Sequence, residues 1–115
     1  MNRIYIHVPF CISKCAYCDF YSVEGNDFQE IFVSALLKEL ELRKSEISGP
    51  LKSLYFGGGT PSFLDIRYLK NIFRFIEEYF GFEKDAEITL EANPENIDDD
   101  KCKTWKSFGV NRLSI

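Results

Sequence analysis

Apolar positions along the chain follow two different spacings, which predict strands separated by helices. Short runs rich in β-branched and aromatic residues predict four strands, at residues 4–8, 51–56, 86–90 and 110–115. Between these runs, apolar residues recur every three or four positions, as they do on the buried face of a helix. The predicted order is therefore strand then helix, three times, followed by a fourth strand.

Polar residues and glycines mark the ends of the predicted helices. Asp27 is expected to cap the first helix, with Glu30 three residues later. Gly81 should end the second helix and Gly109 the third, because glycine readily takes the left-handed conformation that follows a helix. The third helix is expected over residues 98–108, with acidic residues in its first turn. The expected buried stripes of the first two helices are Phe28, Ile31, Phe32, Ala35, Leu36, Leu40 and Ile47, then Leu69, Ile72, Phe73, Ile76 and Phe80.

Alternating strands and helices predict an α/β fold with a parallel sheet, because each helix returns the chain to the start of the next strand. A doubly wound sheet and a (β/α) barrel both use this pattern. A barrel needs about 200 residues or more. Residues 1–115 are therefore expected to form the N-terminal portion of a larger parallel (β/α) partial barrel, ordered βαβαβαβ, with the rest of the barrel and any C-terminal domain outside this chain.

Composition narrows the class of protein. The 115 residues are 45% hydrophobic and 28% charged, which is typical of a globular domain. The net charge of -4 gives no basic field for a nucleic-acid backbone, so no nucleic-acid partner is expected. No apolar run approaches the roughly 20 residues of a transmembrane helix, and the first ten residues do not resemble a signal peptide. The expected location is the cytoplasm.

Three of the four cysteines lie within eight residues, directly after the first predicted strand. Cys11, Cys15 and Cys18 have the spacing C-x3-C-x2-C. Three thiolates can hold three corners of an iron-sulfur cube and leave the fourth iron open to a small molecule. A zinc site that includes His7, or a disulfide, is the alternative. Cys102 is remote in sequence and is expected to be a small, buried residue.

Two further motifs follow the second and third predicted strands. Residues 57–59 are three consecutive glycines, followed by Thr60, Pro61 and Ser62, so the backbone there can approach a ligand closely. The motif matches neither the P-loop nor the dinucleotide-binding pattern, and a simple turn into a helix starting at Pro61 is the alternative. Glu91 ends the third strand, where a carboxylate can accept hydrogen bonds from ribose hydroxyls or can simply face solvent.

These motifs are expected to meet in space. The cysteine loop, the glycine loop and Glu91 each follow a different strand of a parallel sheet. The carboxyl ends of parallel strands share one rim, and that rim is where such folds bind ligands. The convergence favours an enzyme-like cofactor site over a zinc module.

The motifs together resemble the oxygen-independent coproporphyrinogen III oxidase family of radical S-adenosylmethionine (SAM) proteins. The likeness covers nearly the whole chain and comprises residues 5–20, 57–62, 91–94 and 109–115, in the family's order. Within the family, the closer resemblance is to the HemW-type heme chaperones. The decarboxylating oxidases have a further cysteine two residues after the triad, where this chain has Phe20, and usually an Asp-Pro pair after the glutamate, where this chain has Asn93 before a proline.

The resemblance implies a role for each motif. A [4Fe-4S] cluster and SAM are the implied cofactors, with heme or another porphyrin as a further ligand, and the reduced cluster would cleave SAM to a 5′-deoxyadenosyl radical. A client heme protein and an electron donor such as a flavodoxin or ferredoxin are the implied partners, and coproporphyrinogen III oxidation is the alternative activity. The implied cluster ligands are Cys11, Cys15 and Cys18; the implied SAM contacts are Tyr5, Gly58 and Glu91; and Tyr17, Gly59 and Thr60 would line a second SAM or substrate pocket.

Overall fold

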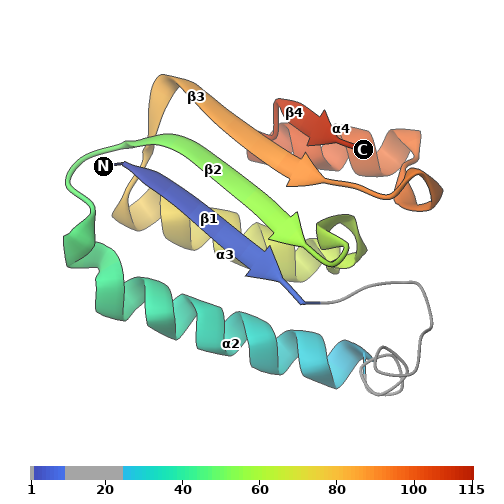
Figure 1. The fold of residues 1–115 in the computed structure, drawn as a ribbon, viewed down its shortest axis with the longest axis horizontal. Coiled ribbons are helices and arrows are strands. Elements are labelled where there is room, and N and C mark those ends of the chain that lie inside the picture. Colours follow the sequence, from blue (N-terminus) through green and yellow to red (C-terminus); the bar gives the residue numbers. More distant parts are fainter. Residues whose placement is uncertain (1, 10–24) are drawn as a thin grey trace.

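The computed structural model describes residues 2–9 and 25–115, which form a four-stranded parallel sheet with helices against it (Figure 1). The strands are neighbours in chain order, and their carboxyl ends lie at one edge of the sheet. The α/β fold with parallel strands is therefore confirmed. The strands are β1 (Arg3–Val8), β2 (Leu51–Gly58), β3 (Phe82–Glu91) and β4 (Arg112–Ser114), and the α-helices are α2 (Gly25–Arg43), α3 (Ile66–Tyr79) and α4 (Asp99–Phe108). Short 3₁₀ turns, η1 (Lys44–Glu46), η2 (Pro61–Phe63) and η3 (Pro94–Asn96), connect them.

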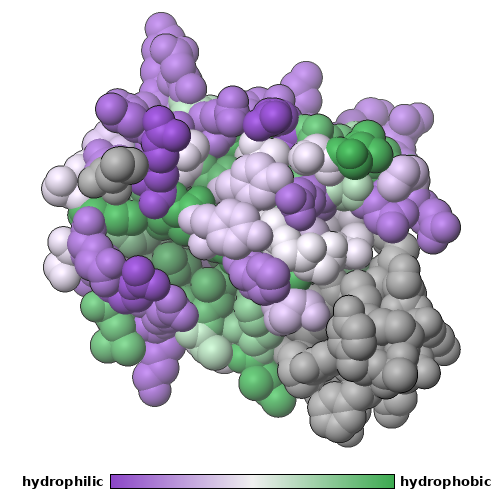
Figure 2. All heavy atoms as spheres, in the orientation of Figure 1, coloured by the Kyte–Doolittle hydropathy of each residue, from purple (hydrophilic) through white to green (hydrophobic). Residues whose placement is uncertain are grey.

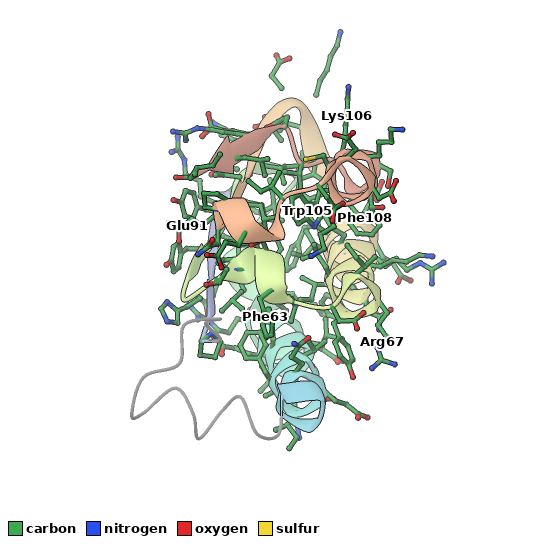
Figure 3. All side chains as sticks on the ribbon, turned by 90° about the vertical axis from the view of Figure 1, so that its right-hand side faces the viewer. Phe63, Arg67, Glu91, Trp105, Lys106 and Phe108 are labelled. Atoms are coloured by element: carbon green, nitrogen blue, oxygen red, sulfur yellow. The ribbon has the colours of Figure 1, made fainter. Side chains whose placement is uncertain are left out.

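All three described α-helices cover the same face of the sheet. Figure 3, seen from the right-hand side of Figure 1, shows the helices on one side of the sheet, with Trp105 and Phe108 among them, and Glu91 on the other side. A doubly wound sheet carries helices on both faces, whereas a barrel wall carries them only outside. Within the described residues, the arrangement is that of a barrel wall with its inner face open.

The face beneath the helices is a continuous apolar core. Leu54, Phe56 and Leu90 are fully buried there, and the ring of Phe73 on α3 packs 5.5 Å from that of Phe56. Phe73 also lies 5.6 Å from Phe108, which ties α3 to α4. Trp105 is 1% exposed, as expected of a core residue. The core therefore joins the sheet to α3 and α4 through aromatic contacts.

The start and the buried face of α2 differ from the prediction. The helix begins at Gly25, so Asp27 lies inside it and is not its cap. It ends at Arg43, which leaves Ile47 beyond the helix and after the turn η1. Ile31 is 67% exposed, while Gln29 is buried and accepts a hydrogen bond from the backbone N–H of Asp65. Two residues along a helix turn it by about 200°, so burial of Gln29 places Ile31 on the opposite side.

The other predicted helix ends are close to those observed. The Asp98 side chain accepts a hydrogen bond from the Lys101 backbone N–H at 2.7 Å and so caps α4. Gly109, with φ of 112°, ends that helix in the left-handed conformation. Pro61 does not begin α3, because it opens the separate turn η2 and the helix is capped later by Asp65.

Candidate functional site

Two hydrogen bonds join the carboxyl ends of β2 and β3 and the loops that follow them. The backbone N–H of Gly58 donates to Oε1 of Glu91 at 3.1 Å. Farther from the sheet, the backbone N–H of Asn93 donates to Oγ of Ser62 at 3.2 Å, and Ser62 is 3% exposed. The glycine loop and the glutamate loop, expected from the sequence to meet, are thus in direct contact.

The Glu91 carboxylate has a second protein donor. The hydroxyl of Tyr55 on β2 donates to Oε2 of Glu91 at 2.6 Å. This hydrogen bond to a carboxylate raises the pKa of the Tyr55 phenol above its ordinary value, and a hydrogen bond with Ser114 acts in the opposite direction. Among the described residues, each carboxylate oxygen therefore has one protein donor and keeps lone pairs for a further hydroxyl.

Tyr5 reaches this cluster through ring stacking. Its ring lies 5.6 Å from that of Tyr55, with an angle of 17° between the planes, and its side chain is 59% exposed. Gly57 makes room for the pair, since a Cβ there would lie 2.6 Å from the Tyr5 hydroxyl and 2.9 Å from Cε1 of Tyr55. The absence of a side chain at Gly57 thus leaves the space in which the two tyrosine rings stack.

The requirement for glycine is stricter at Gly58, because its backbone has a positive φ. Its φ is +108°, and a Cβ would lie 2.7 Å from Cε1 of His7. Next to it, the backbone N–H of Gly59 donates to the Val8 carbonyl at 2.8 Å, which links the loop to the end of β1. The loop is therefore held in place from both neighbouring strands and is not a loose turn.

The other residues expected at this site divide into two groups. Thr60 is described and is only 7% exposed, which makes it less accessible than Tyr5. Tyr17, Cys11, Cys15 and Cys18 lie outside the described residues. Among the residues that the structure does describe, no three His, Cys, Asp or Glu side chains are grouped so as to hold a metal ion.

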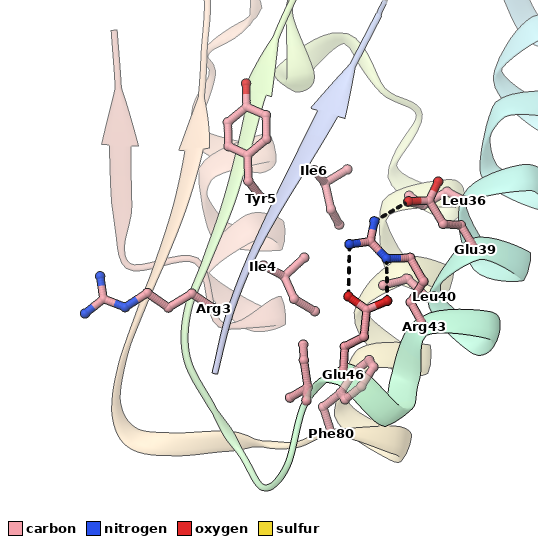
Figure 4. Close-up of a pocket in the computed structure, with 11 residues that line it drawn as sticks. Arg3, Ile4, Tyr5, Ile6, Leu36, Glu39, Leu40, Arg43, Glu46 and Phe80 are labelled. Carbon is pink, nitrogen blue, oxygen red and sulfur yellow. Dashed lines mark hydrogen bonds and ion pairs between the residues drawn. The ribbon is translucent and has the colours of Figure 1, made fainter. Parts of the chain in front are cut away.

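A cavity of about 220 Å³ lies between the first residues of β1 and the end of α2, and Tyr5 of the rim cluster is among its lining residues (Figure 4). Apolar side chains, including Ile4, Ile6 and Leu40, line it. Figure 2 shows hydrophobic surface over this part of the molecule. Its Arg43 is paired with Glu39 at 2.9 Å and with Glu46 at 3.0 Å, so the charges in the cavity largely neutralise one another. The rim carries the chemistry that could bind a polar cofactor, and this cavity does not.

The fold and the rim define a parallel α/β protein that presents one carboxylate and a constrained glycine loop at the carboxyl ends of its strands. Residues 5–115 match the radical SAM superfamily, so the chain belongs to that superfamily. The membership of the radical SAM superfamily predicted from the motifs is confirmed. In the described residues, no helix is long and apolar enough to cross a membrane.

Several known proteins are similar to this chain. The heme chaperone HemW of Buchnera aphidicola subsp. Schizaphis graminum is 41% identical over 97% of the chain, and the heme chaperone HemW of Synechocystis is 38% identical over 96%. The structure of Escherichia coli coproporphyrinogen III oxidase, HemN, a radical SAM enzyme, superposes with a TM-score of 0.78 at 29% identity over 95% of the chain. The chain spans 31%, 28% and 26% of these proteins, respectively.

Tyr55 belongs to this cluster but is not predicted by the sequence motifs. Strand alternation could have placed Tyr55 on the same face as Gly57, and away from the apolar Leu54 and Phe56. Its partner Tyr5 comes from another strand, however, and that pairing depends on the register between β1 and β2.

Proposed function

We propose that this rim binds SAM beside a [4Fe-4S] cluster, in a protein that delivers heme to client proteins. Tyr5, Gly58 and Glu91 are the proposed SAM contacts. The observation that carries the proposal is the Glu91 carboxylate, which is fixed by Gly58 and Tyr55 and still has lone pairs to accept hydrogen bonds from the ribose hydroxyls.

The proposed cluster ligands are Cys11, Cys15 and Cys18. Cys11 follows only two residues after Pro9, and β1 ends at this rim with Val8. When bound and reduced, the cluster supplies the electron for SAM cleavage. The described residues would orient the nucleoside and hold the loop that faces it. Gly59, Thr60 and Tyr17 are proposed to line a second SAM or substrate pocket.

The chaperone role rests on similarity and on two residues. Heme chaperones are among the similar proteins. Phe20 and Asn93 replace residues that are typical of the decarboxylating oxidases. Heme as ligand, a client heme protein, a flavodoxin or ferredoxin as electron donor, and a cytoplasmic location belong to the same proposal.

Iron and sulfide analysis after anaerobic reconstitution tests the cluster. The protein should bind about four irons per chain, and Cys15→Ser should lose most of them. Cys102→Ser is the matched control and should retain the iron, because Cys102 lies on α4, half-buried and packed against the hydrophobic core. A colourless protein that takes up zinc in place of iron would contradict the proposed cluster.

Two assays of the full-length protein separate the proposed activity from its alternative. A chaperone should bind heme and leave coproporphyrinogen III unchanged in the presence of SAM and a reductant. Decarboxylation of coproporphyrinogen III, with SAM consumed, would refute the chaperone role and establish the oxidase activity.

A further inference from the structure

Tyr55 touches both of the side chains that the proposed function assigns to SAM on this face, yet it is not one of those contacts. Its hydroxyl donates to Oε2 of Glu91 at 2.6 Å, and its ring stacks on that of Tyr5 at 5.6 Å. The three residues belong to three different strands, and β2 lies between the other two. Tyr55 is thus a single side chain that links two proposed ligand-binding groups.

We infer that Tyr55 is a positioning residue: its hydroxyl fixes the orientation of the Glu91 carboxylate and its ring fixes that of Tyr5, so that both face bound SAM. This inference rests on the proposed function, because it takes Glu91 and Tyr5 to be the SAM contacts. It adds a residue that acts through them.

The hydroxyl matters because one donor alone cannot fix a carboxylate. Gly58 holds Oε1 of Glu91 through its backbone N–H, and Tyr55 holds Oε2. With a donor on each oxygen, rotation of the carboxylate breaks a hydrogen bond, and hydrogen bonds to an ionised acceptor are among the stronger ones. Without the Tyr55 hydroxyl, the half-buried Glu91 would keep, within the part of the chain that the structure describes, only the 3.1 Å bond from Gly58. Its remaining lone pairs would then no longer be held in one direction.

The ring matters because Tyr5 is 59% exposed and needs a support to stay in one orientation. Tyr55 provides a stacked partner, and Gly57 leaves the space that the pair occupies. Ordering an exposed side chain before the ligand arrives removes an entropy cost from binding. The two halves of Tyr55, hydroxyl and ring, therefore have separable roles.

Equilibrium dialysis of SAM against the reconstituted full-length protein tests the inference. Tyr55→Phe keeps the stack and removes the hydrogen bond, and should weaken SAM binding about tenfold; Tyr55→Leu should weaken it further. Tyr79→Phe is the matched control, since Tyr79 is an exposed tyrosine on α3, and it should leave the affinity unchanged. Iron content is measured for each variant, so that a lost cluster is not mistaken for a lost contact.

A double-variant comparison separates this inference from the proposed function. Glu91→Gln should weaken SAM binding, and adding Tyr55→Phe to it should weaken binding much less than Tyr55→Phe does alone, because the hydroxyl acts through Glu91. If Glu91→Gln leaves SAM affinity unchanged, the proposed function fails. If Glu91→Gln weakens binding while Tyr55→Phe does not, only the positioning role is overturned.

Titration of the phenol provides a readout that needs no cofactor. The difference in ultraviolet absorbance between the protein and Tyr55→Phe reports Tyr55, whose pKa should lie above the ordinary value of about 10 and fall back in Glu91→Gln. The neutral phenol is the donor, so its hydrogen bond is complete below about pH 10 and is lost as the pH rises through the raised pKa. A Tyr55 pKa that does not fall in Glu91→Gln would refute the hydrogen bond on which the positioning role depends.

Discussion

The two faces of the sheet use alternate residues of the same strands for different purposes. On the helix-covered face, Leu54, Phe56 and Leu90 are fully buried and contact other apolar side chains. On the open face, their neighbours Tyr55 and Glu91 are half-buried and joined by a 2.6 Å hydrogen bond. Apolar packing does not require one particular orientation of each side chain, whereas hydrogen bonds are directional and fix the orientation of the groups that they join. Stability and ligand binding are therefore expected to depend on different, interleaved positions.

The comparison predicts the largest loss of stability on the helix-covered face. Phe56→Ala should lower the free energy of unfolding by about 3–5 kcal/mol, because it removes a buried ring and leaves a cavity beside Phe73. Urea denaturation measures the change. Tyr55→Phe, one residue away on the open face, is the control and should change stability far less. Equal losses of stability in the two variants would contradict the view that stability depends mainly on the helix-covered face.

A second prediction concerns Gly58 at the rim, where stability and binding should both respond. Gly58→Ala forces a side chain into φ of +108° and against the His7 ring, at a cost of about 1–3 kcal/mol. It should also displace the N–H that holds Glu91, and so weaken SAM binding, as measured by equilibrium dialysis.

Gly49 provides a matched control for that prediction. It also has a positive φ, +92°, but it lies at the opposite end of the sheet, just before β2, and a Cβ there would meet nothing closer than 3.6 Å. Gly49→Ala should therefore lower stability through backbone strain and leave SAM affinity unchanged. Similar SAM affinities in the two variants would contradict a specific role for Gly58 at the rim.

The sequence predicted the sheet well because its signals are local. Alternating apolar residues mark the strands, and Asp98 and Gly109 act as helix ends within their own segment. The first helix was less well predicted, because burial of Gln29 depends on the distant Asp65 backbone, to which it bonds. A polar residue buried by a tertiary contact cannot be recognised from local apolar spacing.

The sequence could assign the candidate site to the ends of particular strands, but not its individual contacts. Glu91 and the glycine loop could be placed at one rim because parallel strands end together. The Tyr55 contacts could not be predicted, because they depend on the cross-strand pairing of Tyr5 with Tyr55 and on the hydrogen bond from the Tyr55 hydroxyl to Glu91 on the next strand. The register between strands is a property of the folded sheet, and one sequence does not reveal it.

The smallest expected effect concerns Thr89, a polar residue on the open face. It tests whether the Thr89 hydroxyl belongs to the hydrogen-bonded cluster of that face. Thr89 pairs in register with Tyr55 and Arg112, is 1% exposed, and its Oγ1 has no hydrogen-bond partner among the described residues. Thr89→Val should therefore leave stability unchanged or raise it by about 1–2 kcal/mol in urea denaturation, because it removes an unpaired buried hydroxyl from a side chain of the same shape. Ser62→Ala is the control, since this equally buried hydroxyl accepts from the Asn93 backbone and its removal should cost about 1–3 kcal/mol. If Thr89→Val is as costly as Ser62→Ala, the Thr89 hydroxyl has a partner in the folded protein and belongs to the hydrogen-bonded cluster of the open face.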